Sequence, residues 1–153
     1  MKALVTYFSA EFGKTSQAAR ELAGMLGADI FEIVPDPPYS REDLNYMNPL
    51  ARCNREHFGK KDVPVSGSVG SFDQYDTVYI GFPIWYGSAP DVVNSFCAGY
   101  DWDGKTVYIF ATSGGSGIGK TAAKLQPFIG GAKIADARRI DSAAELEDWV
   151  AAE

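Results

Sequence analysis

Cysteine and histidine are scarce in this sequence, which has two cysteines and one histidine among 153 residues. Cys53 and Cys97 lie far apart, and His57 is the sole imidazole that could join them. A structural zinc site uses four such ligands, and a disulfide framework uses several paired cysteines. We therefore expect neither a disulfide nor a metal site.

Positive charge is also in short supply. The sequence has 14 Lys and Arg residues against 20 Asp and Glu residues, which gives a formal net charge of −6. Nucleic acids and anionic membranes are bound by clusters of basic side chains. The sequence therefore predicts that neither nucleic acid nor a membrane is a partner.

A long hydrophobic run is missing as well. The start, MKALVTYFSAEFGKT, holds only a few consecutive apolar residues before Glu11 and Lys14. A signal peptide needs an apolar stretch of about 7–15 residues, and a membrane-spanning helix needs about 20. This pattern predicts a cytoplasmic protein.

What the chain does contain is a regular alternation of strand-like and helix-like segments. Its length and its 46% hydrophobic content predict one domain, residues 1–153. Strands buried on both faces and separated by helices imply a doubly wound α/β fold with a parallel sheet. Runs rich in Val, Ile, Tyr and Phe predict strands at 2–8, 29–34, 77–82, 106–112 and 132–140.

Three helices are expected between and after these strands. The first covers residues 15–26 and ends before Gly27, the second opens at Pro90, and the third opens with a capping box at Ser142 and Glu145. The residues expected on their buried sides are Ala18, Leu22, Met25 and Leu26; Val92, Val93, Phe96 and Cys97; and Leu146, Trp149 and Val150.

Residues 35–72 interrupt the alternation. Their prolines, glycines and serines predict mostly loop, with short helices near 41–46 and 51–57. A long loop in a compact domain is often a lid over a functional site. An irregular crossover that only covers the sheet is an equally good interpretation.

The stretch TSGGSGIGKT has the letter pattern of a nucleotide-binding phosphate loop, with Gly114, Gly119, Lys120 and Thr121 at the required spacing. A nucleotide hydrolase also needs a strand that ends in Asp to hold magnesium, whereas the strands here end in GFPIW and FATSG. Too few residues follow Thr121 to complete such a domain. We therefore interpret this match as a coincidence.

Three loops taken together point to a different ligand. FSAEFGKTS follows the first strand, GFPIWYGSAP the third and TSGGSGIG the fourth. Ligands of open parallel sheets bind at the carboxyl ends of the strands, where the winding direction reverses. The first loop places Ser and Thr hydroxyls next to a helix N-terminus, and this combination suits a phosphate. The others supply aromatic residues and a glycine-rich wall, so the three loops predict a site for a flat ring tethered to a phosphate.

These stretches resemble those of the flavodoxins, closest to the short-chain bacterial group with GFPIWWG-type and TSGGSG-type flavin loops. The resemblance covers nearly the whole chain. It implies a flavodoxin-like five-stranded sheet in the order 2-1-3-4-5 and noncovalent binding of FMN. It further implies phosphate contacts from Ser9, Gly13, Lys14 and Thr15, with Glu11 beside them, ring contacts from Pro83, Ile84, Trp85, Tyr86 and Gly87, and a second ring edge lined by Thr112, Ser113, Gly114 and Gly115.

Some of these assignments have alternatives. The first loop is one residue longer between Ser9 and Gly13 than the family's common S-x-T-G-x-T, and Glu11 adds a carboxylate beside the expected phosphate. Trp85 could instead be a core tryptophan, and Lys14 could be a solvated lysine at the helix start.

FMN binding leaves two function classes open, because a flavodoxin carries electrons between proteins whereas a flavin reductase adds a substrate pocket. From Asp62 to Asp103 the sequence has six acidic residues and no basic one, and the GFPIWYG loop lies within this stretch. An acidic rim around the ring would attract partner proteins with basic docking surfaces and repel NAD(P)H. We therefore expect a monomeric, low-potential one-electron carrier without catalytic residues. The alternatives are an FMN-dependent NAD(P)H:quinone or flavin reductase, with residues 35–62 as a substrate wall, and a domain that binds no flavin.

Overall fold

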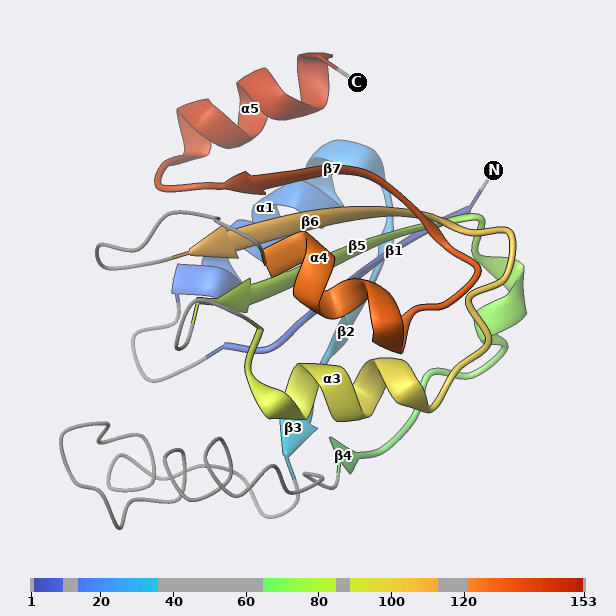
Figure 1. The fold of residues 1–153 in the computed structure, drawn as a ribbon. Helices are drawn as coiled ribbons and strands as arrows, with labels where there is room; N and C mark the ends of the chain where they lie inside the picture. The colour runs from blue at the N-terminus through green and yellow to red at the C-terminus, as the bar shows by residue number, and fades with distance from the viewer. Residues whose placement is uncertain (1, 10–13, 36–64, 85–88, 113–120, 153) are drawn as a thin grey trace, which may run out of the picture.

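The computed structural model describes residues 2–9, 14–35, 65–84, 89–112 and 121–152. A five-stranded parallel sheet with the spatial order β2-β1-β5-β6-β7 forms its centre (Figure 1). Numbered along the chain, this is the order 2-1-3-4-5, so the predicted sheet is confirmed. The strands are β1 (Ala3–Tyr7), β2 (Asp29–Glu32), β5 (Thr77–Pro83), β6 (Thr106–Thr112) and β7 (Lys133–Arg139).

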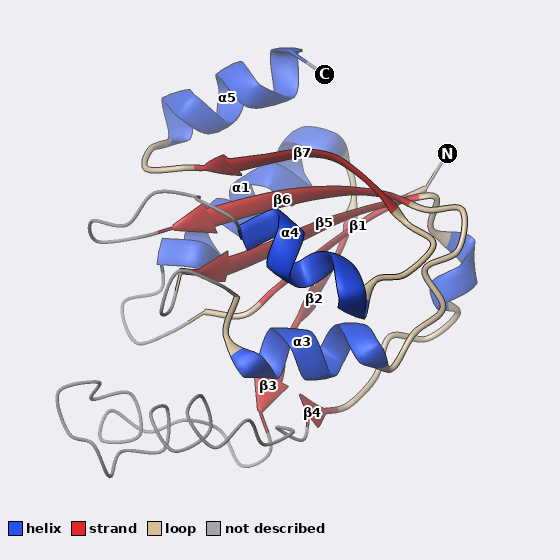
Figure 2. Cartoon of the chain, viewed as in Figure 1, coloured by secondary structure: helices blue, strands red, loops and turns tan. Residues whose placement is uncertain are grey.

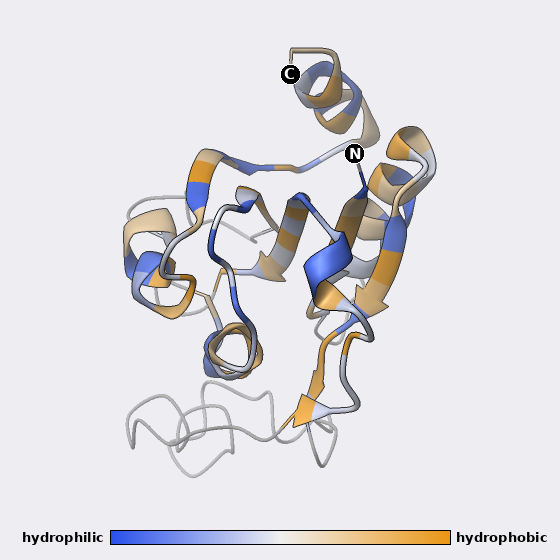
Figure 3. Ribbon diagram, turned by 90° about the vertical axis from the view of Figure 1, so that its right-hand side faces the viewer, coloured by the Kyte–Doolittle hydropathy of each residue, from blue (hydrophilic) through white to orange (hydrophobic). Residues whose placement is uncertain are grey.

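Helices cover both faces of the sheet, as Figure 2 shows. Helices α1 (Lys14–Leu26) and α5 (Ala143–Ala152) lie on one face. Helices α3 (Asp91–Ala98) and α4 (Thr121–Leu125) lie on the other. Figure 3 shows hydrophobic and hydrophilic residues alternating around these helices, as expected when one side of each is buried. None of the helices in the described part of the chain is long and apolar enough to cross a membrane.

Along the central strands, alternate side chains pack on opposite faces of the sheet. In β6, Val107, Ile109 and Ala111 belong to the core beneath α3, whereas Tyr108 and Phe110 pack toward α1 and α5. Side chains alternate across a strand with a period of two. A strand buried on both faces therefore reads as the continuous apolar run that predicted it.

Helix α1 packs closely on the sheet through small residues. Ala19, Leu22 and Ala23 are buried, but Met25, which was expected on the buried stripe, is 39% exposed. That expectation was wrong because Met25 lies at the margin of the stripe near the helix end. The helix stops as predicted, with Gly27 at φ 63° and the Ala28 N–H donating to the Ala23 carbonyl at 3.0 Å.

The other two predicted helix starts are confirmed. Pro90 precedes α3, and its carbonyl accepts from the Val93 N–H at 2.9 Å. At α5 the Ser142 hydroxyl accepts from the Glu145 N–H at 3.2 Å. The Glu145 carboxylate accepts from the N–H of Asp141, one residue earlier than the usual capping box.

Part of the irregular segment 35–72 forms a second, small sheet. Strands β3 (Val34–Pro35) and β4 (Val65–Ser66) pair antiparallel, followed by a short 3-10 helix, η2 (Phe72–Gln74). The sequence did not predict this pairing, because two-residue strands carry no periodic signal. The short helices predicted near 41–46 and 51–57 lie outside the described residues.

The outermost strands of the main sheet carry charge. Asp29 and Glu32 are exposed on β2. The other outer strand, β7, contains a run of charged residues that includes Asp136, Arg138 and Arg139. The ion pair from Arg138 to Asp136 measures 3.6 Å between side chains that are nearly half exposed. Such exposed pairs contribute little to stability.

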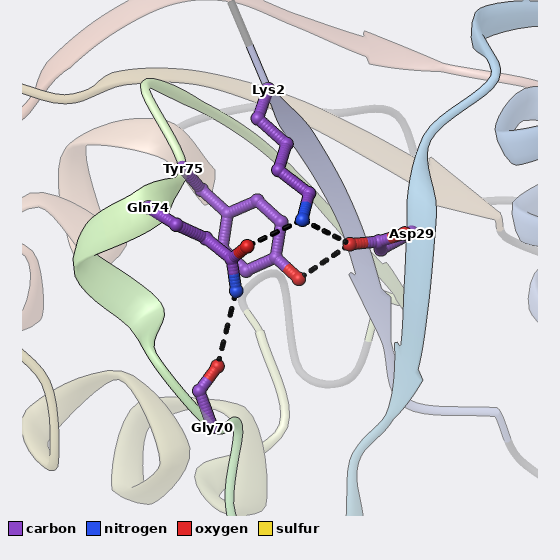
Figure 4. Close-up of polar contacts among 5 residues, drawn as sticks. All are labelled: Lys2, Asp29, Gly70, Gln74 and Tyr75. Carbon is purple, nitrogen blue, oxygen red and sulfur yellow. Dashed lines mark hydrogen bonds and ion pairs between the residues drawn. The ribbon is translucent and has the colours of Figure 1, made fainter.

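A polar cluster joins β1, β2 and η2 at the amino edge of the sheet. Figure 4 shows Lys2, Asp29 and Tyr75 pointing toward one another. The Tyr75 hydroxyl donates to Asp29 at 2.7 Å, and the Lys2 ammonium lies 3.5 Å from the same oxygen and donates to Gln74. The hydrogen bond from Tyr75, aided by Lys2, holds the pKa of Asp29 below its ordinary value. Burial and the bond to Asp29 raise the pKa of Tyr75 to about 12.

A buried lysine fixes the same turn from the other side. The Lys105 ammonium donates to the carbonyls of Phe72 and Tyr75 at 3.2 and 2.5 Å, and it lies 4.8 Å from the centre of the Phe72 ring. Carbonyl oxygens and an aromatic face both favour a cation. Lys105 therefore ties the start of β6 to the turn before β5.

We predict that Tyr75→Phe makes stability less sensitive to acid. A carboxyl whose pKa is lowered by folding stabilises the protein above its unfolded pKa, and this contribution is lost as the pH falls through the folded value. Without the Tyr75 hydroxyl the pKa of Asp29 moves back toward 3.8, so less is lost. Urea unfolding from about pH 6 to about pH 3 measures this. Tyr100→Phe is the control, because its hydroxyl is bonded to the Val69 backbone N–H and not to a carboxylate.

We predict opposite effects for two glycine substitutions. Gly81 lies beside Phe110, and a Cβ at Gly81 would come within 2.1 Å of the Phe110 ring. Gly81→Ala should lower the free energy of unfolding by about 1–3 kcal/mol. Gly24→Ala, in α1, meets nothing within 4 Å and should raise it by about 0.5–1 kcal/mol. Equal effects of the two changes on the urea midpoint would contradict the close packing at Gly81.

Candidate functional site

The carboxyl ends of β1, β5 and β6 lie side by side at one edge of the sheet (Figure 1). Pro83, at the end of β5, is the register partner of Thr112, at the end of β6. The Ile84 N–H donates to the Thr112 carbonyl at 2.9 Å, and the Phe8 N–H donates to the Gly81 carbonyl at 3.0 Å. Backbone bonds therefore continue past the strand ends and fix the residues from which all three predicted loops leave.

Helix α1 begins at this edge, next to β1. The Ser16 N–H, in its first turn, donates to the hydroxyl of Ser9 at 3.2 Å. Ser9 thus satisfies one of the N–H groups that a helix N-terminus leaves without an intrahelical partner. This hydrogen bond brings Ser9, two residues after the end of β1, against the positive end of the 13-residue helix.

A pair of hydroxyls joins α1 to β6. The Thr15 and Thr112 side-chain oxygens lie 2.7 Å apart, and the two residues are only 2% and 6% exposed. Thr112 follows the alternation of β6, so its side chain points to the same face as Phe110, toward α1. The site therefore includes a buried contact between residues 97 positions apart.

The described groups suit a phosphate. The start of α1 carries the exposed Lys14 and the hydroxyl of Thr15, and the hydroxyl of Ser9 is bonded to its first turn. Phosphate oxygens are acceptors, and they are recognised by hydroxyl and N–H donors and by positive charge. The donor set is therefore chemically matched to a phosphate monoester.

The structure describes six of the predicted cofactor-binding residues and brings them to this edge: Ser9, Lys14, Thr15, Pro83, Ile84 and Thr112. The Ile84 side chain packs in the core with the residues beneath α3, and Thr112 contacts Thr15. The remaining predicted residues lie outside the described part of the chain: Glu11, Gly13, Trp85, Tyr86, Gly87, Ser113, Gly114 and Gly115.

The expected acidic rim is largely wrong. Asp73, Asp76, Asp101 and Asp103 precede β5 or β6 and lie at the amino edge of the sheet, opposite the site. Strand β5 separates the edges by seven residues, which is about 20 Å at roughly 3.3 Å per residue. Screening at about 0.1 M salt acts over about 10 Å, so these charges have little effect on the site. Asp91, at the start of α3, lies at the site edge, and Asp62 is outside the described residues.

The phosphate-loop pattern gains no support from the structure. The helix after it, α4, has only five residues. A phosphate loop places its ligand at the N-terminus of a helix, and a helix this short offers only a small dipole there. Gly114, Gly119 and Lys120 lie outside the described residues.

Sequence reasoning missed two features of the site. Ser9 was assigned to the phosphate, but its role in capping α1 was not foreseen. Thr112 was assigned to the ring, but its contact with Thr15 was not foreseen. The signal available for Thr112 was the period of two along β6, which places it on the α1 face.

A flavodoxin family model matches residues 2–153, which is nearly the whole chain. The chain belongs to the flavodoxin family. Two solved structures described as flavoproteins resemble this flavodoxin. One, from Bacteroides uniformis, is 36% identical, covers 98% of this chain and 97% of its own, and has a TM-score of 0.90. The other, from Bacteroides eggerthii, is 35% identical, covers 99% and 96%, and has a TM-score of 0.87.

A third structure is more distant. It is a flavoprotein from Lactobacillus acidophilus solved in complex with FMN, and it is 20% identical, covers 97% of this chain and 98% of its own, and has a TM-score of 0.72. At this identity the likeness concerns the fold alone. No curated protein matches the chain.

Proposed function

We propose that this flavodoxin binds FMN at the carboxyl edge of β1, β5 and β6 and carries single electrons between redox proteins. The observation that carries the proposal is the hydroxyl-lined start of α1, with Ser9 and Thr15, beside the boundary between β1 and β5. The winding direction of the sheet reverses at that boundary, which is where doubly wound folds bind their ligands.

Different residues of the chain would contact different parts of the cofactor. Ser9, Lys14 and Thr15 would hold the phosphate, and the segments that follow Pro83 and Thr112 would lie along the ring. FMN, when bound, supplies the redox chemistry, because its ring accepts and releases electrons. The protein's part is to bind the phosphate, orient the ring and exclude water from it.

Family membership and overall charge support a carrier over a reductase. The net charge of −6 favours partner proteins with basic docking surfaces, because the summed charge of a protein steers its encounters. The placement of four acidic residues at the far edge weakens one argument against NAD(P)H, since their repulsion is screened at the site. The FMN-dependent NAD(P)H:quinone or flavin reductase therefore stays the second candidate.

We predict that Ser9→Ala combined with Thr15→Ala weakens FMN binding at least about tenfold and leaves riboflavin binding nearly unchanged. Hydrogen bonds to a charged group contribute about 1.5–3 kcal/mol each, and riboflavin lacks the phosphate. Quenching of flavin fluorescence by the apoprotein gives both dissociation constants. Tyr100→Phe is the control, because it removes a hydroxyl that accepts from the Val69 N–H before β6, at the amino edge of the sheet and opposite the site, and it should change neither constant. Equal weakening of both flavins would place the phosphate elsewhere.

We predict that the pure, FMN-loaded protein oxidises NADH or NADPH with a quinone acceptor no faster than free FMN does. A reductive titration followed by the visible spectrum should separate into two one-electron steps.

Electron exchange with a basic redox protein should slow as salt is added, because the attraction between opposite net charges is screened. Turnover that saturates with NAD(P)H and exceeds the free-FMN rate would instead assign the reductase function.

A further inference from the structure

Thr112 lies where the three segments of the site meet. Its backbone is paired with Pro83, and its carbonyl accepts the N–H of Ile84, the first residue after β5. Its side chain contacts Thr15 in the first turn of α1. One residue therefore touches both the helix start assigned to the phosphate and the strand end from which a ring-binding segment leaves.

The contact between the two hydroxyls is short and dry. The oxygens lie 2.7 Å apart, and either could be the donor. Both residues are more than nine-tenths buried, so water competes poorly for this hydrogen bond. Each threonine hydroxyl has one proton to donate and two lone pairs with which to accept. The direction of the bond is therefore set by what else the two hydroxyls meet.

A phosphate dianion would set that direction. Its oxygens accept hydrogen bonds and offer no proton, so Thr15 must donate to it. Thr15 can then only accept from Thr112, and the two hydroxyls form a chain in which each bond polarises the next. Without the Thr112 hydroxyl, the Thr15 oxygen would lose its donor, and its side chain would lose the contact that fixes its rotamer.

We propose that Thr112 is a positioning residue for the cofactor phosphate: its buried hydroxyl donates to Thr15 and thereby aims the Thr15 proton at the phosphate. This inference rests on the proposed function, because it requires that Thr15 contacts the phosphate. It differs from the role that the family resemblance implies for Thr112, which is contact with the edge of the ring. The two roles predict different dependence on the phosphate, so binding measurements separate them.

The test compares FMN and riboflavin binding to the apoproteins of Thr112→Val and Thr112→Ser. Valine keeps the shape of threonine and removes the hydroxyl, whereas serine keeps the hydroxyl. We expect Thr112→Val to bind FMN about 3- to 10-fold more weakly, as for loss of one hydrogen bond, and riboflavin as the wild type does. Thr112→Ser should restore most of the FMN affinity. Equal weakening of both flavins would overturn the proposal in favour of a ring contact, and unchanged FMN affinity would overturn it as well.

A double-mutant cycle adds a second, independent criterion. If Thr112 acts through Thr15, then Thr112→Val should cost nothing further in FMN affinity once Thr15 is already Val. Additive losses would show that Thr112 acts on the cofactor without Thr15. Failure of the proposed function looks different, because the wild-type apoprotein would then bind FMN no more tightly than riboflavin, or not at all.

Thr6→Val is the matched control for burial. Thr6 is fully buried in β1, and its hydroxyl donates at 3.0 Å to the carbonyl of Phe31 in β2. Its substitution removes one buried hydrogen bond, as Thr112→Val does, and should lower the thermal unfolding temperature similarly. The ratio of FMN to riboflavin affinity should stay at the wild-type value in Thr6→Val and fall in Thr112→Val. The same fall in both variants would mean that the ratio reports general loosening, which would overturn the proposal.

Discussion

The parallel pairing of β5 with β1 and with β6 is the constraint on which the site depends. Because neighbouring strands run the same way, their carboxyl ends reach the same edge, and Thr112 comes opposite Pro83. The register matters as much as the direction. A shift of one residue would turn the Thr112 side chain from the α1 face to the α3 face and separate it from Thr15.

Much of the fold could be predicted because strands buried on both faces read as apolar runs, and helix ends carry Gly, Pro and Ser signals. The failures have physical causes. Met25 fits the helical period, but the face of α1 that packs on the sheet uses small residues such as Ala19 and Ala23, and Met25 at the margin of this face stays 39% exposed. The antiparallel pair of β3 and β4 has two-residue strands, which are too short for any period to show.

The site was predictable as a set of loops and less so as a set of contacts. The sequence places Ser9, Thr15 and Thr112 at strand ends and a helix start, which is where they lie. In the sequence, Asp76 and Asp103 also lie near the ring loop. In the structure, Asp76 is just before β5 and Asp103 is just before β6, so the length of a strand separates each of them from the site. Distance along the chain is therefore a poor measure of distance in space wherever a strand intervenes.

The charged outer strands described above bear on how this sheet meets other chains. An outer strand exposes backbone N–H and C=O groups that can pair with another strand, and charged side chains on such a strand oppose that pairing. Strand β2 has only four residues, and Asp29 and Glu32 are exposed at its ends. Strand β7 carries charged side chains at Lys133, Asp136 and Arg138. The charge on both strands thus disfavours stacking of sheets edge to edge, and with it aggregation at high protein concentration.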